Sequence, residues 1–462
     1  METEYKGNNK LILGIVLGVV TFWLFAQSMV NIVPAVQSDL GISSGILSIS
    51  ISLTALFSGM FMVAAGGLAD KYGRVKLTNI GLILSIIGSL CLVVAQGSVL
   101  LIAGRIIQGI SAACIMPSTL ALMKTYFQGA ERQRALSYWS IGSWGGSGIC
   151  SFFGGFVATY FGWRSIFIIS IIIAVTSLLL LKGTPESKVT AVGEKKPFDI
   201  GGLITFVVAM LTINIVITSG ASMGWTNPVI VGLLVVFLIS ALLFARIEMK
   251  HTNSFIDFSL FKNKAYSGAT LSNFLLNASA GTMIVANTYV QIARGFSSFQ
   301  SGLLTIGYLV CVLSSIRIGE KVLQKLGSRK PMMVGTFTAI IGIALMTFTF
   351  IPGIAYNVLV FVGFALYGFG LGIYATPSTD AAISNAPSDK IGSASGIYKM
   401  ASSLGGAMGV ALSSSLFNAI GTNGNMEIAG SAGLLLNVAF GIVALISIMM
   451  TVPKEKTELV RQ

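Results

Sequence analysis

Charged residues and metal-binding side chains are scarce in this sequence. Of its 462 residues only 10% are Asp, Glu, Lys or Arg, and it has one histidine and four cysteines. With 54% hydrophobic residues and a mean hydropathy of +0.85, this composition excludes a soluble protein built around one or two cores. It is typical of a multi-pass membrane protein whose solvent is the lipid bilayer.

The rare cysteines and the single histidine indicate no metal centre. Cys91, Cys114, Cys150 and Cys311 lie in apolar stretches, and the sequence has no CxxC or cysteine–histidine cluster, so we expect neither disulfides nor a bound metal. His251 lies in a basic loop, where we interpret it as a solvated surface residue. We find no GxxxxGK[ST] phosphate loop and no nucleophile–base arrangement. The sequence therefore predicts a protein that is not an enzyme, has no catalytic residues and needs no cofactor besides a proton gradient.

Fourteen apolar stretches of about 18–25 residues separate the charges, and each is long enough to span a bilayer as a helix. Helices are expected because a lone segment in lipid must satisfy its own backbone hydrogen bonds. A charge at the bilayer centre costs roughly 2.5–3.5 kcal/mol, which explains its exclusion. The expected spans lie near 11–33, 45–67, 77–96, 99–121, 135–158, 164–182, 200–219, 228–247, 266–290, 302–323, 331–350, 356–378, 393–417 and 430–450.

The net charge of +13 predicts membrane topology rather than a nucleic-acid partner. With the N-terminus inside, we assign 25 of the 29 basic residues to cytoplasmic segments and only Arg164 and Arg294 to outside connections. The remaining two, Arg105 and Arg317, fall within spans. This asymmetry places both termini in the cytoplasm of a plasma-membrane protein. The first span is long and lacks a small-residue cleavage site, so we expect it to be retained.

Two polar stretches, 182–199 and 246–264, divide the chain into six, two and six spans. We expect an N-terminal six-helix bundle at 1–182, cytoplasmic linkers with a two-helix insert (200–219 and 228–247) at 183–265, and a C-terminal bundle with a cytoplasmic tail at 266–462. The outer blocks repeat features, such as a late proline in each fourth span, Pro117 and Pro377. Such parallel halves are typical of a transporter that rocks two pseudo-symmetric bundles around a site near the midplane.

The loop after the second span contains Gly66, Leu68, Asp70, Gly73 and Arg74 in the pattern GxLaDrxGrk. This pattern resembles the first signature of the major facilitator superfamily. The glycines permit a tight turn and close helix approach, and the charges can bond to helix ends, so we interpret the segment as a gating loop. The alternative is a static loop that only anchors topology.

The fourth span matches a second signature, LxxxRxxQGxgaa, through Leu101, Arg105, Gln108 and Gly109. This signature is similar to that of proton-coupled antiporters. Arg105 is expected about 10 Å below the outer surface. A cation there responds to the protonation of a nearby carboxyl group, which favours a coupling role. Snorkelling toward the outer interface is the alternative.

The resemblance extends over essentially the whole chain. The fifth span keeps Gly154 and Gly155 of the antiporter pattern GPxxGG but has Cys150-Ser151 in place of Gly-Pro, and later segments such as Gly224-Trp225 also match. The chain is similar to the fourteen-span drug:proton antiporters, and among them to the Gram-positive multidrug pumps that export quinolones. The resemblance implies an all-α major facilitator fold with two pseudo-symmetric bundles and two inserted helices, and a monomer.

One departure concerns the first span, where members of the family often carry an acid. Here Phe25 to Pro34 contains no carboxylate. Either another acid carries the proton, or recognition of cations is weakened in favour of zwitterionic and neutral substrates.

A substrate cavity is predicted from polar residues that recur on one helix face. Gln27, Asn31 and Pro34 follow an i, i+4, i+7 pattern in the first span. The first span after the insert repeats it, and the resemblance implies that both helices line the cavity. Hydrogen bonding between helices is the alternative for the amides, and plain packing is the alternative for the aromatic residues. The candidate cavity residues are Gln27, Asn31, Gln108, Asn273, Asn277, Gln291, Tyr367 and Tyr374.

Four acids lie near spans, namely Asp39, Asp70, Glu320 and Asp380. Asp39 follows the outer end of the first span, and it could receive protons or stabilise the start of the second span. Arg317 is expected to pair with Glu320 as an i, i+3 neighbour. Our hypothesis is that protonation of Asp39, sensed with Arg105, drives exchange, with Asp70 and Glu320 as inner latches and Asp380 as a further candidate for proton coupling.

Together these features predict a proton-coupled efflux antiporter that exports amphipathic drugs or toxic organic compounds, such as quinolones, dyes and quaternary ammonium compounds, by alternating access. Its predicted partners are such small molecules, protons and the lipid bilayer. The alternative is a dedicated exporter of an endogenous lipid, fatty acid or metabolite.

Overall fold

A computed structural model of the chain is helical throughout the part that it describes. Its described residues are 5–26, 28–42, 44–146, 156–158, 160–187, 199–250, 256–296, 298–421 and 424–454. Ten helical segments among them are long and apolar enough to cross a membrane. They lie in α3, α4, α5, α8, α10, α11 with α12, α13 with α14, α16, η3 with α17, and α18.

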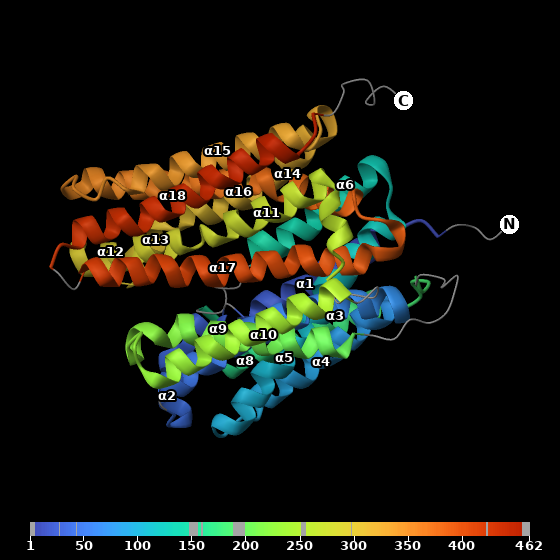
Figure 1. Cartoon of the computed structure of the whole chain (residues 1–462), viewed down its shortest axis with the longest axis horizontal. Coiled ribbons are helices and arrows are strands. Elements are labelled where there is room, and N and C mark those ends of the chain that lie inside the picture. Colours follow the sequence, from blue (N-terminus) through green and yellow to red (C-terminus); the bar gives the residue numbers. More distant parts are fainter. Residues whose placement is uncertain are drawn as a thin grey trace. The chain divides into compact units, whose positions relative to one another are not determined.

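The chain forms two compact units, and residues 1–260 with 386–400 make up the first. In this unit α4 packs on α5 and α8, α3 packs on α5, and α1 packs on α8 (Figure 1). Its helices are α1 (Asn9–Ala26), α2 (Ser28–Leu40), α3 (Ser44–Tyr72), α4 (Arg74–Val93), α5 (Ser98–Tyr126), α6 (Gly129–Ser140), the π-helix η1 (Ile141–Gly145), α8 (Arg164–Leu181), α9 (Ile200–Met223), α10 (Pro228–Lys250), most of the 3-10 turn η2 (Phe258–Lys262), the 3-10 turn η3 (Ser388–Lys390) and the start of α17 (Ile391–Gly421).

Residues 261–385 with 401–462 form the second unit. Here α16 packs on α14 and α15, and α18 packs on α11, α12 and α15. Its helices are α11 (Lys264–Ala278), α12 (Gly281–Arg294), α13 (Ser298–Leu304), α14 (Ile306–Leu326), α15 (Arg329–Met346), α16 (Gly353–Ser384), the rest of α17 and α18 (Met426–Thr451).

Several helices begin at a side chain that caps their free backbone N–H groups. Asp199 accepts a hydrogen bond from the N–H of Gly202 in α9, at 2.8 Å. Asn263 does the same for α11, where it accepts from Ala265 and Tyr266, and Asn425 accepts from Ile428 in α18. Such caps stabilise a helix by about 1 kcal/mol each. They also explain why these helices begin where the polar connections end.

The expected span near 266–290 is continuous but not a regular α-helix. Around Ser279 the backbone bonds shift to the i, i+3 pattern, with Ala280 N–H donating to Asn277 and Thr282 N–H donating to Ser279. The hydroxyl of Ser279 also donates to the carbonyl of Leu276 at 2.6 Å. Serine hydroxyls that bond to the backbone compete with helical bonds and bend helices. The single expected helix is therefore replaced by α11 and α12.

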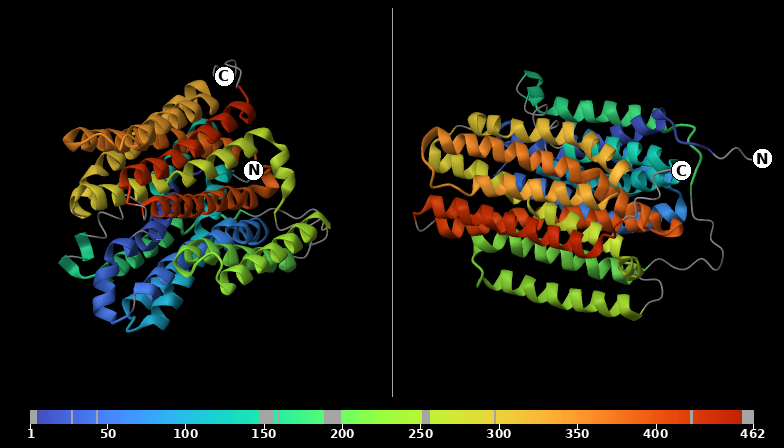
Figure 2. Two further views of the ribbon diagram at one scale, coloured as in Figure 1. Left: turned by 60° about the vertical axis from the view of Figure 1, so that its left-hand side comes forward. Right: turned by 90° about the horizontal axis from the view of Figure 1, so that it is seen from above.

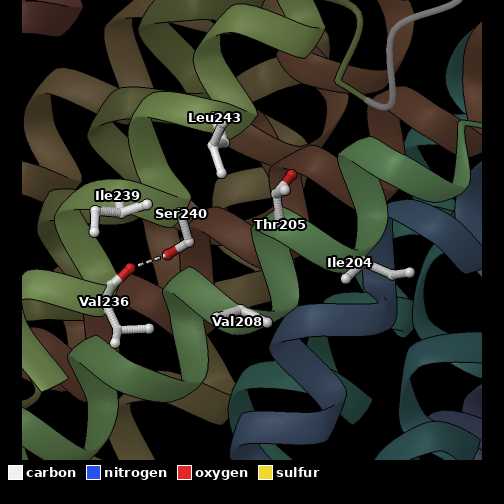
Figure 3. A pocket seen from close by; sticks show the side chains of 7 residues that line it. All are labelled: Ile204, Thr205, Val208, Val236, Ile239, Ser240 and Leu243. Atoms are coloured by element: carbon white, nitrogen blue, oxygen red, sulfur yellow. Dashed lines mark hydrogen bonds between the residues drawn. The ribbon is translucent and has the colours of Figure 1, made fainter.

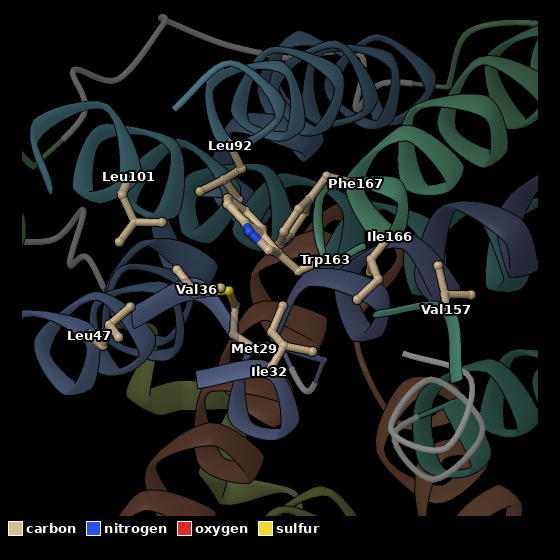
Figure 4. Close-up of a cluster of buried hydrophobic side chains, with 10 residues drawn as sticks. All are labelled: Met29, Ile32, Val36, Leu47, Leu92, Leu101, Val157, Trp163, Ile166 and Phe167. Carbon is tan, nitrogen blue, oxygen red and sulfur yellow. The ribbon is translucent and has the colours of Figure 1, made fainter. Parts of the chain in front are cut away.

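A buried apolar cluster lies in the first unit where the ends of several helices meet (Figure 4). Trp163 and Phe167 at the start of α8 pack edge to face, with ring centroids 6.0 Å apart. Burying such rings gives the largest single contributions to packing. The cluster comprises Met29, Ile32, Val36, Leu47, Leu92, Leu101, Val157, Trp163, Ile166 and Phe167.

Helices α9 and α10, the expected two-helix insert, run side by side as an antiparallel pair (Figure 2). A groove of about 280 Å³ lies along this pair and is lined by Ile204, Thr205, Val208, Val236, Ile239, Ser240 and Leu243 (Figure 3). The two hydroxyls bond to their own helices, Thr205 to Gly201 and Ser240 to Val236. The groove thus offers an apolar surface without a free polar anchor, which suits lipid chains better than a specific ligand.

Candidate functional site

The predicted gating loop is mostly helical in the structure: Gly66 and Asp70 lie near the end of α3, only Gly73 lies between the helices, and Arg74 begins α4. Asp70 is the central acceptor of this α3–α4 turn. Its Oδ1 accepts hydrogen bonds from Arg74 Nη2 and from the backbone N–H of Gly392, each at 2.9 Å. Its Oδ2 accepts from the N–H of Ser393 at 3.0 Å. The carboxylate therefore lies at the N-terminus of α17, where the helix dipole favours a negative charge.

Arg74 extends this network at the start of α4. Its Nη1 donates to Thr125 Oγ1 of α5 at 2.7 Å, and its Nη2 also donates to the carbonyl oxygen of Ser388 at 3.3 Å. Asp70 and Arg74 are 6% and 4% exposed, so water screens their ion pair little. The turn thus joins α3, α4, α5 and the start of α17 by charge-assisted bonds.

Two glycines of the motif are required by geometry. A Cβ atom at Gly66 would lie 2.2 Å from the carbonyl oxygen of Gly392, so only glycine permits this approach of α3 to α17. Gly73 has a φ of +123°, which side chains other than glycine rarely adopt, and its Cβ would lie 2.4 Å from Glu186. Glu186 caps α4 there, accepting from the N–H groups of Val75 and Lys76 at 3.0 and 2.9 Å.

Arg105 lies in the middle of a buried polar cluster of the first unit and is 0% exposed. Its Nε donates to the carbonyl oxygen of Ser50 at 3.2 Å, and its Nη1 donates to Gln108 Oε1 at 3.2 Å. Gln108 in turn donates to Ser89 Oγ at 3.4 Å. This burial argues against the snorkelling interpretation. The arrangement holds a fixed cation between α3, α4 and α5.

Asp39, at the end of α2, forms an ion pair with Arg164 at the start of α8 and accepts a hydrogen bond from Trp163 Nε1 at 3.2 Å. Hydrogen bonding to Arg164 holds the pKa of Asp39 below its ordinary value, and the bond from Trp163 acts in the same direction. Arg164 also donates to the carbonyl oxygens of Val93 and Ala95. In this conformation Asp39 is therefore ionised at neutral pH.

The basic residues that we assigned to cytoplasmic segments included Lys399, and this assignment was wrong. Lys399 lies within α17, in the candidate span Ser388–Gly421, and is 6% exposed. Its Nζ is 3.3 Å from Ser143 Oγ and 5.0 Å from the ring centroid of Trp139. The signal was present in the sequence, because a lysine inside an apolar stretch meets the same criterion that identified Arg105.

In the second unit, Asn273 and Asn277 form one hydrogen-bonded group. Asn273 Nδ2 donates to Ser402 Oγ at 2.7 Å, and Asn277 Nδ2 donates to Asn273 Oδ1 at 3.0 Å. Asn273 is 0% exposed. Both amides therefore link α11 and α17 in this conformation, as the alternative interpretation of helix–helix bonding expects.

Two tyrosines of α16 bond to two serines, Ser272 in α11 and Ser279 just after the end of α11. The hydroxyl of Tyr374 lies 2.7 Å from Ser272 Oγ, and that of Tyr367 lies 2.9 Å from Ser279 Oγ. Neither serine was among the residues predicted to line the cavity. Their separation of seven residues equals that of the tyrosines, which is the pattern that could have identified them.

The remaining candidates lie apart from these groups within the second unit. The predicted pair between Arg317 and Glu320 is confirmed, and Glu320 is 3% exposed. Asp380 accepts a hydrogen bond from Ser384 at 2.9 Å. Gln291 donates to Ser301 at 2.9 Å. Each is thus held by a neighbour on its own or the next helix.

Several sequence predictions concern residues outside the part that the structure describes. Gln27, Cys150, Gly154, Gly155 and His251 lie outside it, and so does the side chain of Asn31. Among the described residues, no group of three His, Cys, Asp or Glu side chains could hold a metal ion.

Comparison with known proteins gives a full-length match. Residues 14–410 match the family model described as Major Facilitator Superfamily. The Quinolone resistance protein NorB of Staphylococcus aureus strain MRSA252 is 56% identical over 451 residues, which cover 98% of this chain and 97% of the relative. NorB of strain JH9 matches with the same identity and coverage.

Solved structures share the fold at low sequence identity. The proton:xylose symporter XylE superposes with a TM-score of 0.68 at 16% identity, covering 97% of this chain and 96% of its own. The human organic anion transporter MFSD10 gives a TM-score of 0.64 at 12% identity, covering 95% and 98%. At these identities the likeness supports the arrangement of helices and nothing more.

Proposed function

The chain belongs to the major facilitator superfamily, and from that premise we propose that it exports quinolones and other amphipathic toxic compounds in exchange for protons. The observation that carries the proposal is the 56% identity to a quinolone resistance protein over nearly the full length of both chains. The chain is a multi-pass transporter of the plasma membrane and not an enzyme. Its efflux activity follows from the same identity.

We further propose fourteen spans in a six, two and six arrangement, with both termini in the cytoplasm and a monomer as the working form. The repeated prolines, the two polar stretches and the placement of Lys and Arg support this topology. The bundles would be residues 1–182 and 266–462, with the insert between them.

The gating role that we propose for the α3–α4 turn depends on the bonds that Asp70 accepts from Gly392 and Ser393. A charged acceptor on two backbone N–H groups holds one conformation, and the transport cycle must break these bonds to reach another. Glu320, paired with Arg317, is the proposed counterpart in the second unit.

For proton coupling we propose Arg105 as the fixed cation and Asp39 as the group that exchanges protons, with Asp380 as a further candidate. The ion pair with Arg164 must open before Asp39 can take up a proton at neutral pH, since the pair lowers its pKa. Substrate recognition is assigned to Gln27 and to the polar groups of α2, α5, α11, α12 and α16 named above. These groups would become available as their mutual bonds exchange during the cycle.

Transport by the purified protein in liposomes tests the proposal. With an acidic lumen, an exchanger that releases protons outward accumulates drug inside, so the wild-type chain should concentrate the quinolone norfloxacin and the dye ethidium. An ionophore that collapses the pH gradient should abolish accumulation.

Drug accumulation by the wild-type protein is compared with that in two controls. Empty liposomes measure passive partition of these amphipathic compounds, and the Arg105→Ala variant measures the dependence on the proposed coupling residue. Wild-type protein that accumulates none of the compounds above the empty-liposome level would contradict drug export. Profiling of the culture medium for a missing metabolite would then identify the endogenous cargo.

A further inference from the structure

Lys399 is a charged residue of α17 that the coupling scheme above does not use. It is 6% exposed and lies in a segment long and apolar enough to cross a membrane. A lysine in the hydrocarbon region costs roughly 2.5–3.5 kcal/mol and is found where it lines a polar pathway or meets a partner. Its position inside the protein therefore requires an explanation.

Among the residues that the structure describes, the surroundings of Lys399 accommodate a cation but provide no ion-pair partner. Its ammonium group has three donors. In the described part of the chain it meets Ser143 Oγ at 3.3 Å and the ring of Trp139 at 5.0 Å, and no described carboxylate forms an ion pair with it. A hydroxyl and an aromatic face stabilise a cation only partly.

Trp139 is fixed in its orientation toward Lys399. Its indole Nε1 donates to Thr119 Oγ1 of α5 at 3.0 Å, and the side chain is 0% exposed. Ser143 is 3% exposed and lies in the π-helix Ile141–Gly145. Single π-helical turns are rare and are found frequently at functional sites. Two independent features, a buried cation without an ion-pair partner in the described part of the chain and an irregular helix turn, thus meet at one point.

We propose that Lys399 recognises the carboxylate of acidic or zwitterionic cargo, with Trp139 and Ser143 holding the ammonium group until the cargo arrives. A carboxylate would form a charge-assisted hydrogen bond with the ammonium group and supply the missing negative charge. This inference rests on the proposed export function and makes it more specific.

The proposal also gives a reason for the absence of an acid between Phe25 and Pro34. A carboxylate at that position would favour cationic cargo, whereas a buried lysine favours cargo that carries a carboxylate. This chain has no acid between Phe25 and Pro34 and has the buried Lys399. A purely structural lysine would instead be replaceable by a neutral side chain of the same length with equal effects on every cargo.

An experiment with two proteins and two ligands distinguishes recognition of a carboxylate by Lys399 from a purely structural role of this residue. One axis is the protein, wild type against Lys399→Met, which keeps a long unbranched side chain and removes the charge. The other axis is the ligand, norfloxacin against its methyl ester, which removes the carboxylate and keeps the rest of the molecule. Initial rates in the acidic-lumen liposomes give KM and kcat for each combination.

For the wild type we expect a KM about tenfold lower for the acid than for the ester, as the loss of one charge-assisted bond implies. Lys399→Met should raise the KM for the acid about tenfold and leave that for the ester unchanged. Lys399→Arg, which keeps the charge, should retain most of the preference. Lys182→Met, a substitution of an exposed lysine in the same unit, controls for the loss of any positive charge.

Equal effects of Lys399→Met on acid and ester would overturn the proposal. So would a wild type that does not discriminate between acid and ester, and that result stands even where Lys399→Met fails to fold. Ethidium, which has no carboxylate, reports on the underlying export function. If the wild type moves none of the three compounds, export itself fails, whereas transport without acid preference removes only the role of Lys399.

Discussion

The guanidinium group of Arg105 donates a hydrogen bond to the side-chain oxygen of Gln108, 3.2 Å away and one turn further along α5. Both side chains are 0% exposed. Arg105 also donates to the carbonyl oxygen of Ser50 in α3, so one buried cation satisfies acceptors on two helices. The two helices are therefore joined by a group whose charge is fixed at any physiological pH.

Replacing Arg105 by alanine should lower both coupling and stability. The change removes the buried hydrogen bonds to Gln108 and Ser50, and a hydrogen bond from a charged group contributes about 1.5–3 kcal/mol. We expect gradient-driven uptake to fall by at least roughly tenfold and the unfolding temperature in detergent to drop. Arg105→Lys is the matched control, since it keeps the charge but cannot reproduce both bonds. Wild-type coupling in both variants would remove Arg105 from the mechanism.

The pair between Asp39 and Arg164 predicts a pH-dependent stability. Hydrogen bonding to Arg164 lowers the folded-state pKa of Asp39. The contribution of the pair to stability is therefore present above the ordinary pKa of 3.8 and is lost as the pH falls through the lower folded-state pKa. Thermal unfolding of Asp39→Asn should therefore differ from that of the wild type at neutral pH and converge with it under acidic conditions. A difference that grows on acidification would show that the pair does not act this way.

Arg164→Gln tests the same pair from the other side. Without the guanidinium group, the pKa of Asp39 should rise toward its ordinary value. The pH profile of uptake should then shift to higher pH if Asp39 exchanges protons. An unchanged profile in this variant, together with wild-type rates in Asp39→Asn, would exclude Asp39 as the coupling acid.

Glu186 predicts a measurable contribution to helix α4. Its carboxylate accepts from the N–H groups of Val75 and Lys76, so Glu186→Ala should destabilise the protein by about 1 kcal/mol. Glu131→Ala, which removes an exposed acid from the first turn of α6, is a matched control without these bonds. Denaturation in mixed micelles measures the difference. Equal losses in the two variants would attribute the effect to charge alone.

The bond between Tyr374 and Ser272 can be measured by a double-mutant cycle. Tyr374→Phe and Ser272→Ala each remove one partner, and the coupling free energy between them should be about 0.5–1.5 kcal/mol. Tyr374→Phe combined with Ser279→Ala provides the control, because these side chains belong to different pairs. A coupling no larger than that of the control would mean that the bond contributes nothing to stability.

Local sequence patterns predicted the helices and the main features of the α3–α4 turn. Apolar stretches, glycine spacing and an i, i+3 pair are all properties of neighbouring residues, and the Arg317–Glu320 pair was confirmed for that reason. The partners of Asp70 could not be predicted in the same way. Gly392 and Ser393 are more than 300 residues away and contribute only backbone N–H groups, which no side-chain pattern reveals.

Two contacts were not predicted from the sequence, the cap of α4 and the surroundings of Lys399, and the reasons differ. The cap of α4 by Glu186 joins segments 110 residues apart through an exposed side chain, and nothing in its local sequence distinguishes it from other loop acids. Lys399 was visible as a charge inside an apolar stretch. Its partners Trp139 and Ser143 were not, because the packing that brings distant helices together is absent from a one-dimensional pattern.

The equal spacing of the two tyrosine–serine pairs restricts how α11 and α16 can move. A slide of one helix along the other by a full turn, about 5.4 Å, would break both of these hydrogen bonds at once. Two hydrogen bonds, seven residues apart in each segment, therefore oppose sliding of α11 along α16. As long as both bonds persist, α11 and α16 should move together as one rigid body.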